Sequence, residues 1–421
     1  MKSTLDNLFK TLSLNSPETS FEVELWDGIK EKYGLGPKKF KLIIKKKRAI
    51  SRILGGGSIG FGEEFMRGNI LIEGNLQELI KMGYGQSRIN FQLSLKEKLK
   101  IFYNYLTSLG TLIDSKKNVS YHYDIGNDFY SLWLDPTLTY SCAYFKKEDD
   151  SLERAQLNKY EHISKKLQLK KGETLVDIGC GWGGMMFYAA ENYGVKAEGY
   201  TLSENQYNYV LEEIRKRNVA DFVKVYLKDY REAEGKFDKF VSIGMFEHVG
   251  KKFYPVFFDV VKKILKPEGI GLLQTIGSSE DKPPDPWVTK YIFPGGFIPA
   301  LQVIVKIMNQ KGLDFFDVED LRRHYGKTLD KWIEGFEKNI DKIRKVLIKS
   351  MRTKFSSPGS LERAEEFLRM WRLYLNASSV SFKAGNSHLY QIIFTNGLNN
   401  QLPPTRNYIY SPSSQSERRW K

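Results

Sequence analysis

An acidic residue and alternating glycines follow a short apolar run in the middle of the 421-residue sequence, in the string LVDIGCGWGG. Asp177 ends the run, and Gly179, Gly181 and Gly183 come directly after it. Glycine can adopt a positive φ and lets a ligand approach where a Cβ would clash. An apolar run, a glycine turn and helix-forming residues in this order predict a nucleotide-binding turn at the carboxyl end of a strand.

The residues around this turn narrow the class of ligand. No Lys-Ser or Lys-Thr pair follows the glycines, which argues against a phosphate-gripping P-loop. Because the turn is acidic and its glycines alternate, it favours a neutral or cationic adenosine ligand over a pyrophosphate. The alternative is a plain junction between a strand and a helix.

Other polar residues stand where later strands should end, and open α/β sheets bind ligands at that edge. In chain order these are Thr201 with Gln206, Asp229, Glu247 with His248, and Gln274 with Ile276. Two of these strings have simpler explanations. The string TLSENQ would also serve as a helix N-cap, and a Glu-His pair is common in surface turns.

Several catalytic classes are disfavoured by what the sequence lacks. There is no Gly-x-Ser-x-Gly elbow of a serine hydrolase and no ligand spacing of a zinc site, so we expect no metal. The two cysteines, Cys142 and Cys180, form no Cys-x-x-Cys pair and suggest no disulfide framework.

Alternating apolar runs and helical stretches must position the polar residues. We expect strands at 174–178, 195–200, 222–227, 237–243, 270–275 and 389–394, and helices at 151–169, 204–217 and 253–265. This alternation predicts an α/β fold with a parallel, doubly wound sheet. A helical block at 329–382 should cover the substrate side, and an aromatic string at 121–145 should fold over the ligand as a lid; a purely structural cap is the alternative for that string.

The formal net charge of +15 predicts an anionic partner, either membrane phospholipid or nucleic acid. Seven bases gather without an acid in the string KKFKLIIKKKR, from Lys38 to Arg48. This string is a solvated charged strand, a membrane-surface patch or a nucleic-acid site. No stretch approaches the roughly 20 apolar residues of a membrane span, and the first residues lack the apolar core of a signal peptide. We expect a cytoplasmic protein, peripheral at the inner face of the membrane.

The same features divide the chain into three parts. We expect residues 1–110 to form a basic N-terminal domain associated with lipid or membrane, together with a linker. Residues 111–398 should form the catalytic domain, and residues 399–421, rich in Pro, Ser, Asn and Arg, a flexible tail. Within the first part, glycines at 55–57 predict a loop, and residues 96–117 a polar, partly helical connector.

Six strings in consistent order resemble one enzyme family. They are YDIGNDFY, LDPTLTYSCAYF, LVDIGCGWGG, VSIGMFEHVG, DPWVTKYIFPGG and YLNASSVSF. Together, from Val119 to Gly397, they resemble the cyclopropane-fatty-acyl-phospholipid synthases, which are related to the mycolic acid cyclopropane synthases. The resemblance implies a class I S-adenosylmethionine methyltransferase fold, a Rossmann-like doubly wound sheet, with a smaller N-terminal domain and a helical substrate-side insertion.

The resemblance also implies an activity, with S-adenosylmethionine and bicarbonate as cofactors. The family transfers a methylene group from S-adenosylmethionine to a cis double bond of phospholipid acyl chains. A cyclopropane ring forms through a carbocation intermediate, with bicarbonate as base. The expected partners are the phospholipid membrane surface and unsaturated acyl chains, not nucleic acid, and a homodimer is left open.

The residues that match the family's motifs fall into two groups. The resemblance implies cofactor contacts from Tyr140, Ser141, Asp177, Gly179, Gly181, Gly183, Thr201, Leu202, Gln206, Asp229 and Tyr230. It implies a bicarbonate site made by the backbone of Cys142 and Ile276 with the side chains of Glu247 and Tyr325. A histidine completes that site in the family, and Gln274 stands in its place here. Glutamine can still donate to an anion but does not titrate.

Two other functions stay open at this point. A methyltransferase of the same fold would stop at a methyl-branched lipid or methylate an amine, as some plant N-methyltransferases with a similar pattern do. A nucleic-acid-binding or nucleic-acid-modifying protein would use the positive charge, but the sequence holds no recognisable nucleic-acid module.

Overall fold

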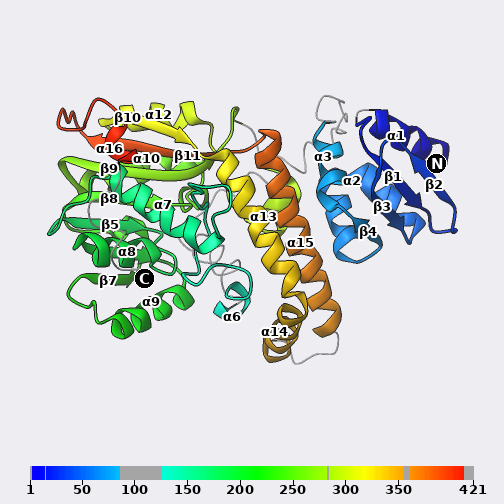
Figure 1. Cartoon of the computed structure of the whole chain (residues 1–421), viewed down its shortest axis with the longest axis horizontal. Coiled ribbons are helices and arrows are strands. Elements are labelled where there is room, and N and C mark those ends of the chain that lie inside the picture. The colour runs from blue at the N-terminus through cyan, green and yellow to red at the C-terminus, as the bar shows by residue number, and fades with distance from the viewer. Residues whose placement is uncertain (1, 15, 86–125, 282–283, 355–359, 412–421) are drawn as a thin grey trace. The chain divides into compact units, whose positions relative to one another are not determined.

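The computed structural model describes residues 2–14, 16–85, 126–281, 284–354 and 360–411 (Figure 1). These residues form two compact units. The first holds the described residues up to position 85 together with 285–294 and 329–386, and the second holds 126–281, 295–328 and 387–411. The connector expected at 96–117 and the first five residues of the aromatic string lie outside the described residues.

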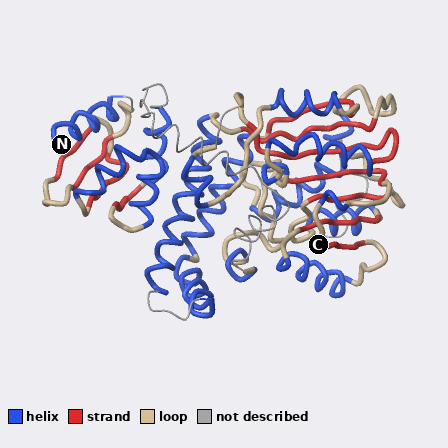
Figure 2. Tube along the Cα trace, turned by 180° about the vertical axis from the view of Figure 1, so that it is seen from behind, coloured by secondary structure: helices blue, strands red, loops and turns tan. Residues whose placement is uncertain are grey.

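A seven-stranded sheet organises the second unit, and the helices of this unit lie against it (Figure 2). Its order is β10-β11-β9-β8-β5-β6-β7. The strands are β5 (Thr174–Ile178), β6 (Lys196–Thr201), β7 (Val223–Leu227), β8 (Phe237–Ile243), β9 (Leu265–Gly277), β10 (Leu313–Asp320) and β11 (His388–Asn396). Strands β5 to β9 run parallel, whereas β11 is antiparallel to both of its neighbours. The predicted doubly wound α/β sheet is confirmed.

Helices connect the parallel strands and cover them. They are α7 (Leu152–Lys166), α8 (Gly184–Tyr193), α9 (Glu204–Arg217), α10 (Tyr254–Ile264) and α12 (Leu301–Gln310). Helices α8 and α9 pack on β6 and β7, and α12 packs on β10. Fully buried side chains such as Ile163, Leu175 and Val210 form the core between α7, β5 and α9. The expected strands and helices agree with the observed ones apart from shifts at their ends, but β10 was not predicted.

The strand order reverses at β5, which has β6 on one side and β8 on the other. The chain leaves β5 in one direction to build β6 and β7 and returns on the other side to build β8 and β9. Such a switch point leaves a crevice beyond the carboxyl ends of the two central strands, because the following connections diverge. The glycine turn after β5 lies at this place.

The end of the described chain corrects the expectation of a flexible tail for residues 399–411. Leu402 and Ile409 are buried, and the short helix α16 (Asn407–Tyr410) packs on α7. Arg406 forms an ion pair with Asp317. Two buried apolar side chains and this ion pair hold a segment whose polar composition suggested disorder. Residues 412–421 lie outside the described residues.

A four-stranded sheet in the order β2-β1-β3-β4 forms the centre of the first unit. Its elements are α1 (Lys2–Leu14), β1 (Ser20–Glu24), β2 (Lys30–Tyr33), β3 (Lys38–Ile44), α2 (Lys47–Met66), β4 (Ile70–Gly74) and α3 (Leu76–Gly85). Strand β3 buries Phe40, Leu42 and Ile44, and it pairs with β1 and β4. The loop expected at 55–57 is wrong: these glycines lie inside α2, which kinks at Gly57 with a φ of 53°.

The remaining helices of the first unit come from later parts of the chain. They are α11 (Pro286–Tyr291), most of α13 (Arg322–Lys338), α14 (Ile340–Lys354) and α15 (Ser360–Ala384). Helix α15 packs on α2, α3 and α14. The contacts therefore group the expected helical insertion with the N-terminal residues, while the domain boundary near residue 110 stays a prediction. None of the described helices is long and apolar enough to span a bilayer.

Candidate active site

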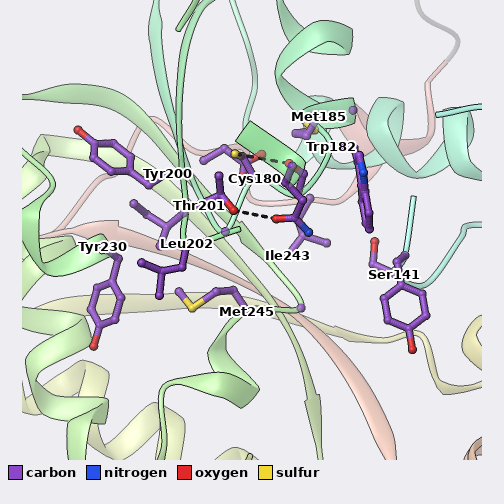
Figure 3. A pocket seen from close by; sticks show the side chains of 18 of the residues that line it. Ser141, Cys180, Trp182, Met185, Tyr200, Thr201, Leu202, Tyr230, Ile243 and Met245 are labelled. Atoms are coloured by element: carbon purple, nitrogen blue, oxygen red, sulfur yellow. Dashed lines mark hydrogen bonds between the residues drawn. The ribbon is translucent and has the colours of Figure 1, made fainter. Parts of the chain in front are cut away.

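A pocket lies at the carboxyl ends of β5, β6 and β8, where the strand order reverses (Figure 3). Figure 3 shows Trp182 on one side of this pocket and Tyr200 and Tyr230 on the other. Ten of the eleven residues predicted to contact the cofactor line it: Tyr140, Ser141, Asp177, Gly179, Gly181, Thr201, Leu202, Gln206, Asp229 and Tyr230. Residues far apart in the sequence therefore converge on one cavity.

The glycine turn has the backbone that the sequence requires. Gly179, Gly181 and Gly183 all have φ between 57° and 82°, the left-handed region that favours glycine. A Cβ on Gly181 would meet no atom within 4 Å, so a larger side chain there would extend into open space at the pocket. Gly183 does not line the pocket: it is the N-cap of α8, and a Cβ there would press on Phe187 at 2.8 Å.

Asp177 presents an unpaired carboxylate oxygen in this pocket. The side chain is buried, and its Oδ1 has no hydrogen-bond partner among the residues that the structure describes. Burial raises the pKa of Asp177 to about 7, and the nearby Lys159 ammonium acts against this shift. Burial lowers the pKa of Lys159 to about 7, and its Nζ donates to Ser141 Oγ at 3.0 Å. The orphaned oxygen fits a ligand that brings a donor or a positive charge.

The string TLSENQ caps a helix and also lines the pocket. Ser203 caps α9 by accepting from the backbone N–H of Gln206 at 3.3 Å. Thr201 and Gln206 line the pocket and are joined by a hydrogen bond from Thr201 Oγ1 to Gln206 Oε1 at 2.7 Å. The helix cap therefore positions the two side chains at the end of β6.

Asp229 is less available as an acceptor than the sequence suggested. Arg231 donates to both of its carboxylate oxygens, from Nε at 2.7 Å and from Nη2 at 2.9 Å. Asp229 also caps the short helix η2 (Tyr230–Glu232). Tyr230 has a buried hydroxyl without a hydrogen-bond partner in the part of the chain that the structure describes, and burial raises the pKa of that phenol to about 12. A ligand on this side of the pocket meets a neutral donor.

Glu247 lies on the short helix η3 (Phe246–His248), next to two residues that line the pocket, Met245 and His248. Its Oε1 accepts from the backbone N–H of Ile276 at 2.5 Å, whereas its buried Oε2 has no hydrogen-bond partner in the described part of the chain. Burial raises the pKa of Glu247 to about 7, and the hydrogen bond from Ile276 opposes that shift. Burial lowers the pKa of His248 to about 4, so that imidazole is neutral at pH 7.

The other residues of the predicted anion site fall into two pairs. Ile276 and Gln274 lie two positions apart on β9, so their side chains share one face. Cys142 precedes Ala143, whose N–H donates to Thr328 Oγ1 at 3.0 Å on α13, three residues after the buried Tyr325. The backbone of Ile276 was expected to contact bicarbonate, and its N–H donates to Glu247 Oε1. Burial raises the pKa of the Cys142 thiol, which stays protonated.

The sequence did not predict the polar residues that contact Gln274, directly or through one another. The buried Gln391 on β11 donates from Nε2 to Gln274 Oε1 at 2.8 Å, and Lys166 on α7 donates to Gln391 Oε1 at 2.8 Å. The Nε2 of Gln274 has no hydrogen-bond partner among the described residues. One signal was present in the sequence: Gln391 interrupts an otherwise apolar strand, and a polar side chain inside a sheet is buried only with partners.

The segment before β5 lies where a cover is expected. Residues 137–141 line the pocket, and Tyr130 of the short helix α6 (Asn127–Tyr130) packs against Trp182 with ring centroids 5.2 Å apart. Trp182 donates from Nε1 to Asn127 Oδ1 at 2.9 Å. The described part of the aromatic string therefore contacts the glycine turn, and its opening as a lid stays a prediction.

Two models of known protein families match this chain. A model described as mycolic acid cyclopropane synthetase matches residues 111–392, which is most of the chain. The chain belongs to the mycolic acid cyclopropane synthetase family. A second model, for a domain of unknown function, matches residues 8–95. The family model covers all the pocket residues described above, and the described residues of the N-terminal match lie in the first compact unit.

Relatives within this family agree with that assignment. The cyclopropane-fatty-acyl-phospholipid synthase of Escherichia coli (strain K12) is 37% identical over 371 residues, covering 86% of this chain and 90% of the relative. A probable fatty acid methyltransferase of Pseudomonas putida is 32% identical over 411 residues, covering 94% and 98%. The crystal structure of a mycolic acid cyclopropane synthase complexed with SAH and CTAB has a TM-score of 0.60 at 32% identity, covering 66% and 98%.

These matches confirm the family resemblance, the S-adenosylmethionine-dependent methyltransferase fold and the assignment of the chain as an enzyme of this cyclopropane synthase family. They also support S-adenosylmethionine as the cofactor, and Asp177 Oδ1 and the open glycine turn fit that ligand. Homology at this level supports S-adenosylmethionine-dependent cyclopropanation of lipids.

Proposed function

We propose that this enzyme transfers a methylene group from S-adenosylmethionine to a cis double bond of phospholipid acyl chains, with bicarbonate as base. The observation that carries the proposal is the pair of buried, unpaired atoms Glu247 Oε2 and Gln274 Nε2, one an acceptor and one a donor, near the end of β9. Bicarbonate fits such a pair because it can donate its own hydrogen to a carboxylate and accept from an amide.

S-adenosylmethionine supplies a methyl group on a positively charged sulfur. The π electrons of the alkene form a bond to that methyl carbon, and the carbon–sulfur bond breaks with its electron pair remaining on sulfur. The acyl chain is left with a carbocation beside the new methyl group. Loss of a proton from that methyl to the base lets the C–H electron pair close the three-membered ring, so atoms and electrons balance.

The protein's residues bind and orient the reactants. In this proposal, Asp177 Oδ1 and the turn at Gly179 and Gly181 hold the cofactor, together with Thr201 at the end of the neighbouring strand β6 and Gln206 on α9. Glu247 accepts the hydrogen of bicarbonate and thereby directs its basic oxygen and receives the proton. A pKa of about 7 suits Glu247 to such a proton transfer near neutral pH.

The intermediate must also be protected from nucleophiles, because a carbocation reacts with any lone pair that reaches it. The Cys142 thiol is buried, its pKa is raised by burial and its Sγ donates to the carbonyl of Ala143 at 3.2 Å. The thiol is therefore not a thiolate, which favours ring closure over capture by sulfur. The neutral His248 is also poorly suited to act as a charged partner.

We also propose that the first unit binds the surface of an anionic membrane. Lys38 and Lys41 on β3 are paired with Glu22 and Glu24. Residues 45–48, which follow β3 and include the first two residues of α2, are four exposed bases that form no ion pair within the described part of the chain. Unpaired bases near anionic lipid contribute about 1 kcal/mol each. This segment is therefore the part of the basic string best suited to lipid.

The experiment for the proposed reaction uses purified enzyme, S-adenosylmethionine and vesicles of a phospholipid with one cis double bond per acyl chain. We expect each acyl chain to gain one methylene unit and to show the ring protons of a cyclopropane by NMR. Vesicles of saturated phospholipid serve as the control. An unchanged acyl mass with all other components present would refute the proposal.

A methyl-branched product is the second candidate. It is favoured by the 32% identical relative described as a probable fatty acid methyltransferase, which matches nearly the whole chain. Both products arise from the same carbocation and differ in which C–H bond is broken. The NMR spectrum separates them, because a methylated alkene keeps a vinyl or branch-methyl signal where a cyclopropane shows ring protons.

A further inference from the structure

The side-chain amide of Gln274 is buried within β9 and has a hydrogen-bond partner on one end only. Its Oε1 accepts from Gln391 Nε2 at 2.8 Å, and its Nε2 has no partner among the described residues. Gln391 stands directly opposite Gln274 in the register of β11 and β9. A buried amide N–H₂ without a partner costs free energy, so its retention calls for a ligand or a role.

The direction of this amide follows from Lys166. An ammonium group has donors and no acceptor, so the group that contacts Lys166 Nζ at 2.8 Å must be the oxygen of Gln391. Gln391 therefore turns its N–H₂ toward β9, where it requires an acceptor. Gln274 meets that need with Oε1, which leaves its own N–H₂ facing away from Gln391. The charge of Lys166, acting through Gln391, therefore determines which end of the Gln274 amide is free.

Lys166 is itself held in place. Its Nζ contacts Glu319 Oε2 at 2.5 Å, and the same oxygen contacts His162 Nε2 at 2.7 Å. Burial lowers the pKa of Lys166, and the charge of Glu319 opposes this shift. Although burial acts to raise it, the hydrogen bond from His162 and the charge of Lys166 hold the pKa of Glu319 at about 2. The carboxylate stays charged and anchors the ammonium.

The free end of Gln274 lies on the same strand as the contact of Glu247. Ile276, two residues further along β9, donates its N–H to Glu247 Oε1, and Glu247 Oε2 is unpaired. The end of β9 therefore offers one oriented donor and one acceptor, both buried. An oxyanion that carries a proton, with bicarbonate as its representative in the proposed reaction, satisfies both.

We propose that Lys166 and Gln391 are positioning residues that lock the Gln274 amide with its N–H₂ toward a protonated oxyanion shared with Glu247. This inference rests on the proposed function for the identity of the anion. In this arrangement the uncharged amide of Gln274, oriented by Gln391 and Lys166, stands in place of a histidine, which would titrate. Anion binding should then depend on the polarity of Gln391 and not only on its size.

A polarity reversal tests this directly. In Gln391→Glu the new carboxylate accepts from Lys166, which also keeps it ionised. It must then accept from Gln274 as well, so Gln274 turns its N–H₂ toward position 391 and presents Oε1 to the anion. In Gln391→Met a side chain of similar length neither donates nor accepts, so Gln274 is released without being reversed. Lys166→Met removes the origin of the orientation and serves as a second, independent variant.

The readout is the affinity of each full-length protein, loaded with S-adenosylhomocysteine, for ¹³C-labelled bicarbonate measured by NMR. We expect Gln391→Glu to weaken bicarbonate at least about tenfold and the two Met variants to weaken it less, because reversal places an acceptor against the anion. S-adenosylhomocysteine affinity should stay within about twofold of the wild type for all three. Thermal melting of each variant shows whether the order of the affinities follows stability.

Every outcome either supports or refutes the orientation of the Gln274 amide by Lys166 and Gln391. Equal bicarbonate affinity in wild type and Gln391→Glu, or a loss that tracks the fall in melting temperature, would overturn it, as would a wild-type protein that binds no bicarbonate. Conversion of unsaturated phospholipid by a protein that fails this test would leave the proposed reaction standing. The expected order of affinities in a protein that does not convert lipid would uphold the locked amide and refute the lipid reaction.

Discussion

Within the described residues, the carboxylate of Glu247 is bound through one oxygen: its Oε1 accepts from the backbone N–H of Ile276 at 2.5 Å, and its Oε2 is buried without a partner. The backbone contact fixes the carboxylate at the end of β9, while the second oxygen keeps its capacity to accept or receive a proton. Burial raises the pKa of this group to about 7, so both protonation states are accessible near neutral pH. Proton transfer needs such a group.

Glu247→Gln should lower turnover of unsaturated phospholipid by about 100-fold or more, because loss of a positioned acid–base group removes 10²–10⁴ in rate. S-adenosylmethionine affinity should stay unchanged, since Glu247 does not line the cofactor pocket. Steady-state assays and calorimetry measure the two quantities. Glu362→Gln, at an exposed position of α15, is the matched control. Full turnover by Glu247→Gln, including in bicarbonate-free buffer, would show that the proton takes another route.

The same substitution should change how stability depends on pH. The pKa of Glu247 is raised from 4.5 in the unfolded chain to about 7 in the folded protein, so the folded state favours the protonated form. The associated stability is fully present below about pH 4.5 and is lost as the pH rises through about 7. Glu247→Gln carries no proton and escapes that loss. Relative to the wild type, it should therefore gain on the order of 2 kcal/mol between pH 5 and pH 8, measured by denaturant unfolding; a constant difference would contradict the raised pKa.

Gly181→Leu should abolish S-adenosylmethionine binding in calorimetry while the protein remains folded. The new side chain meets no protein atom near its Cβ and instead extends into the cofactor pocket. Because Gly181 has a positive φ, the substitution also strains the backbone. Gly172→Leu is the matched control, since Gly172 also has a positive φ and open space but does not line the pocket. Equal cofactor affinity in the two variants would show that the glycine turn is not part of the cofactor site.

Lys46→Gln combined with Lys47→Gln should weaken binding to anionic vesicles by about tenfold or more, because each base near anionic lipid contributes about 1 kcal/mol. Lys38→Gln with Lys41→Gln changes the net charge equally but removes bases that are already paired with Glu22 and Glu24. That pair of substitutions should have the smaller effect. Sedimentation with vesicles at two salt concentrations measures both, and the difference should shrink as salt screens exposed charges. Equal losses would mean that total charge, not this segment, governs binding.

Gln274→His should be tolerated, with turnover within about tenfold of the wild type. One ring nitrogen can accept from Gln391 Nε2 and the other can donate to the anion, which preserves the pattern of the amide. The variant should differ in its pH profile, because imidazole titrates and an amide does not. Turnover against pH at several bicarbonate concentrations measures this. A variant that loses activity at every pH would show that the space around Gln274, not its donor, is what the site requires.

Most of the helices and strands of the second unit could be predicted from the sequence alone. Strands such as Thr174–Ile178 and Phe237–Ile243 were predicted at the observed residues, because short segments rich in apolar residues and bounded by turn residues favour buried strands. The glycines at 179 and 181 carry their own conformational signal, since they adopt a positive φ. These features depend on neighbours in the sequence, so the sequence suffices to find them.

Contacts between residues far apart in the sequence determined the features that the sequence did not predict. Nothing near Gln391 in the sequence indicates that Lys166, 225 positions away, fixes the direction of its amide. Leu402 and Ile409 look like residues of a polar tail until the core that buries them is assembled. The unpaired oxygen of Glu247 and the raised pKa of Asp177 likewise exist only after burial removes water from both carboxylates. Residue types determined which chemistry was available, and tertiary packing decided which polar atoms are satisfied and which are left for a ligand.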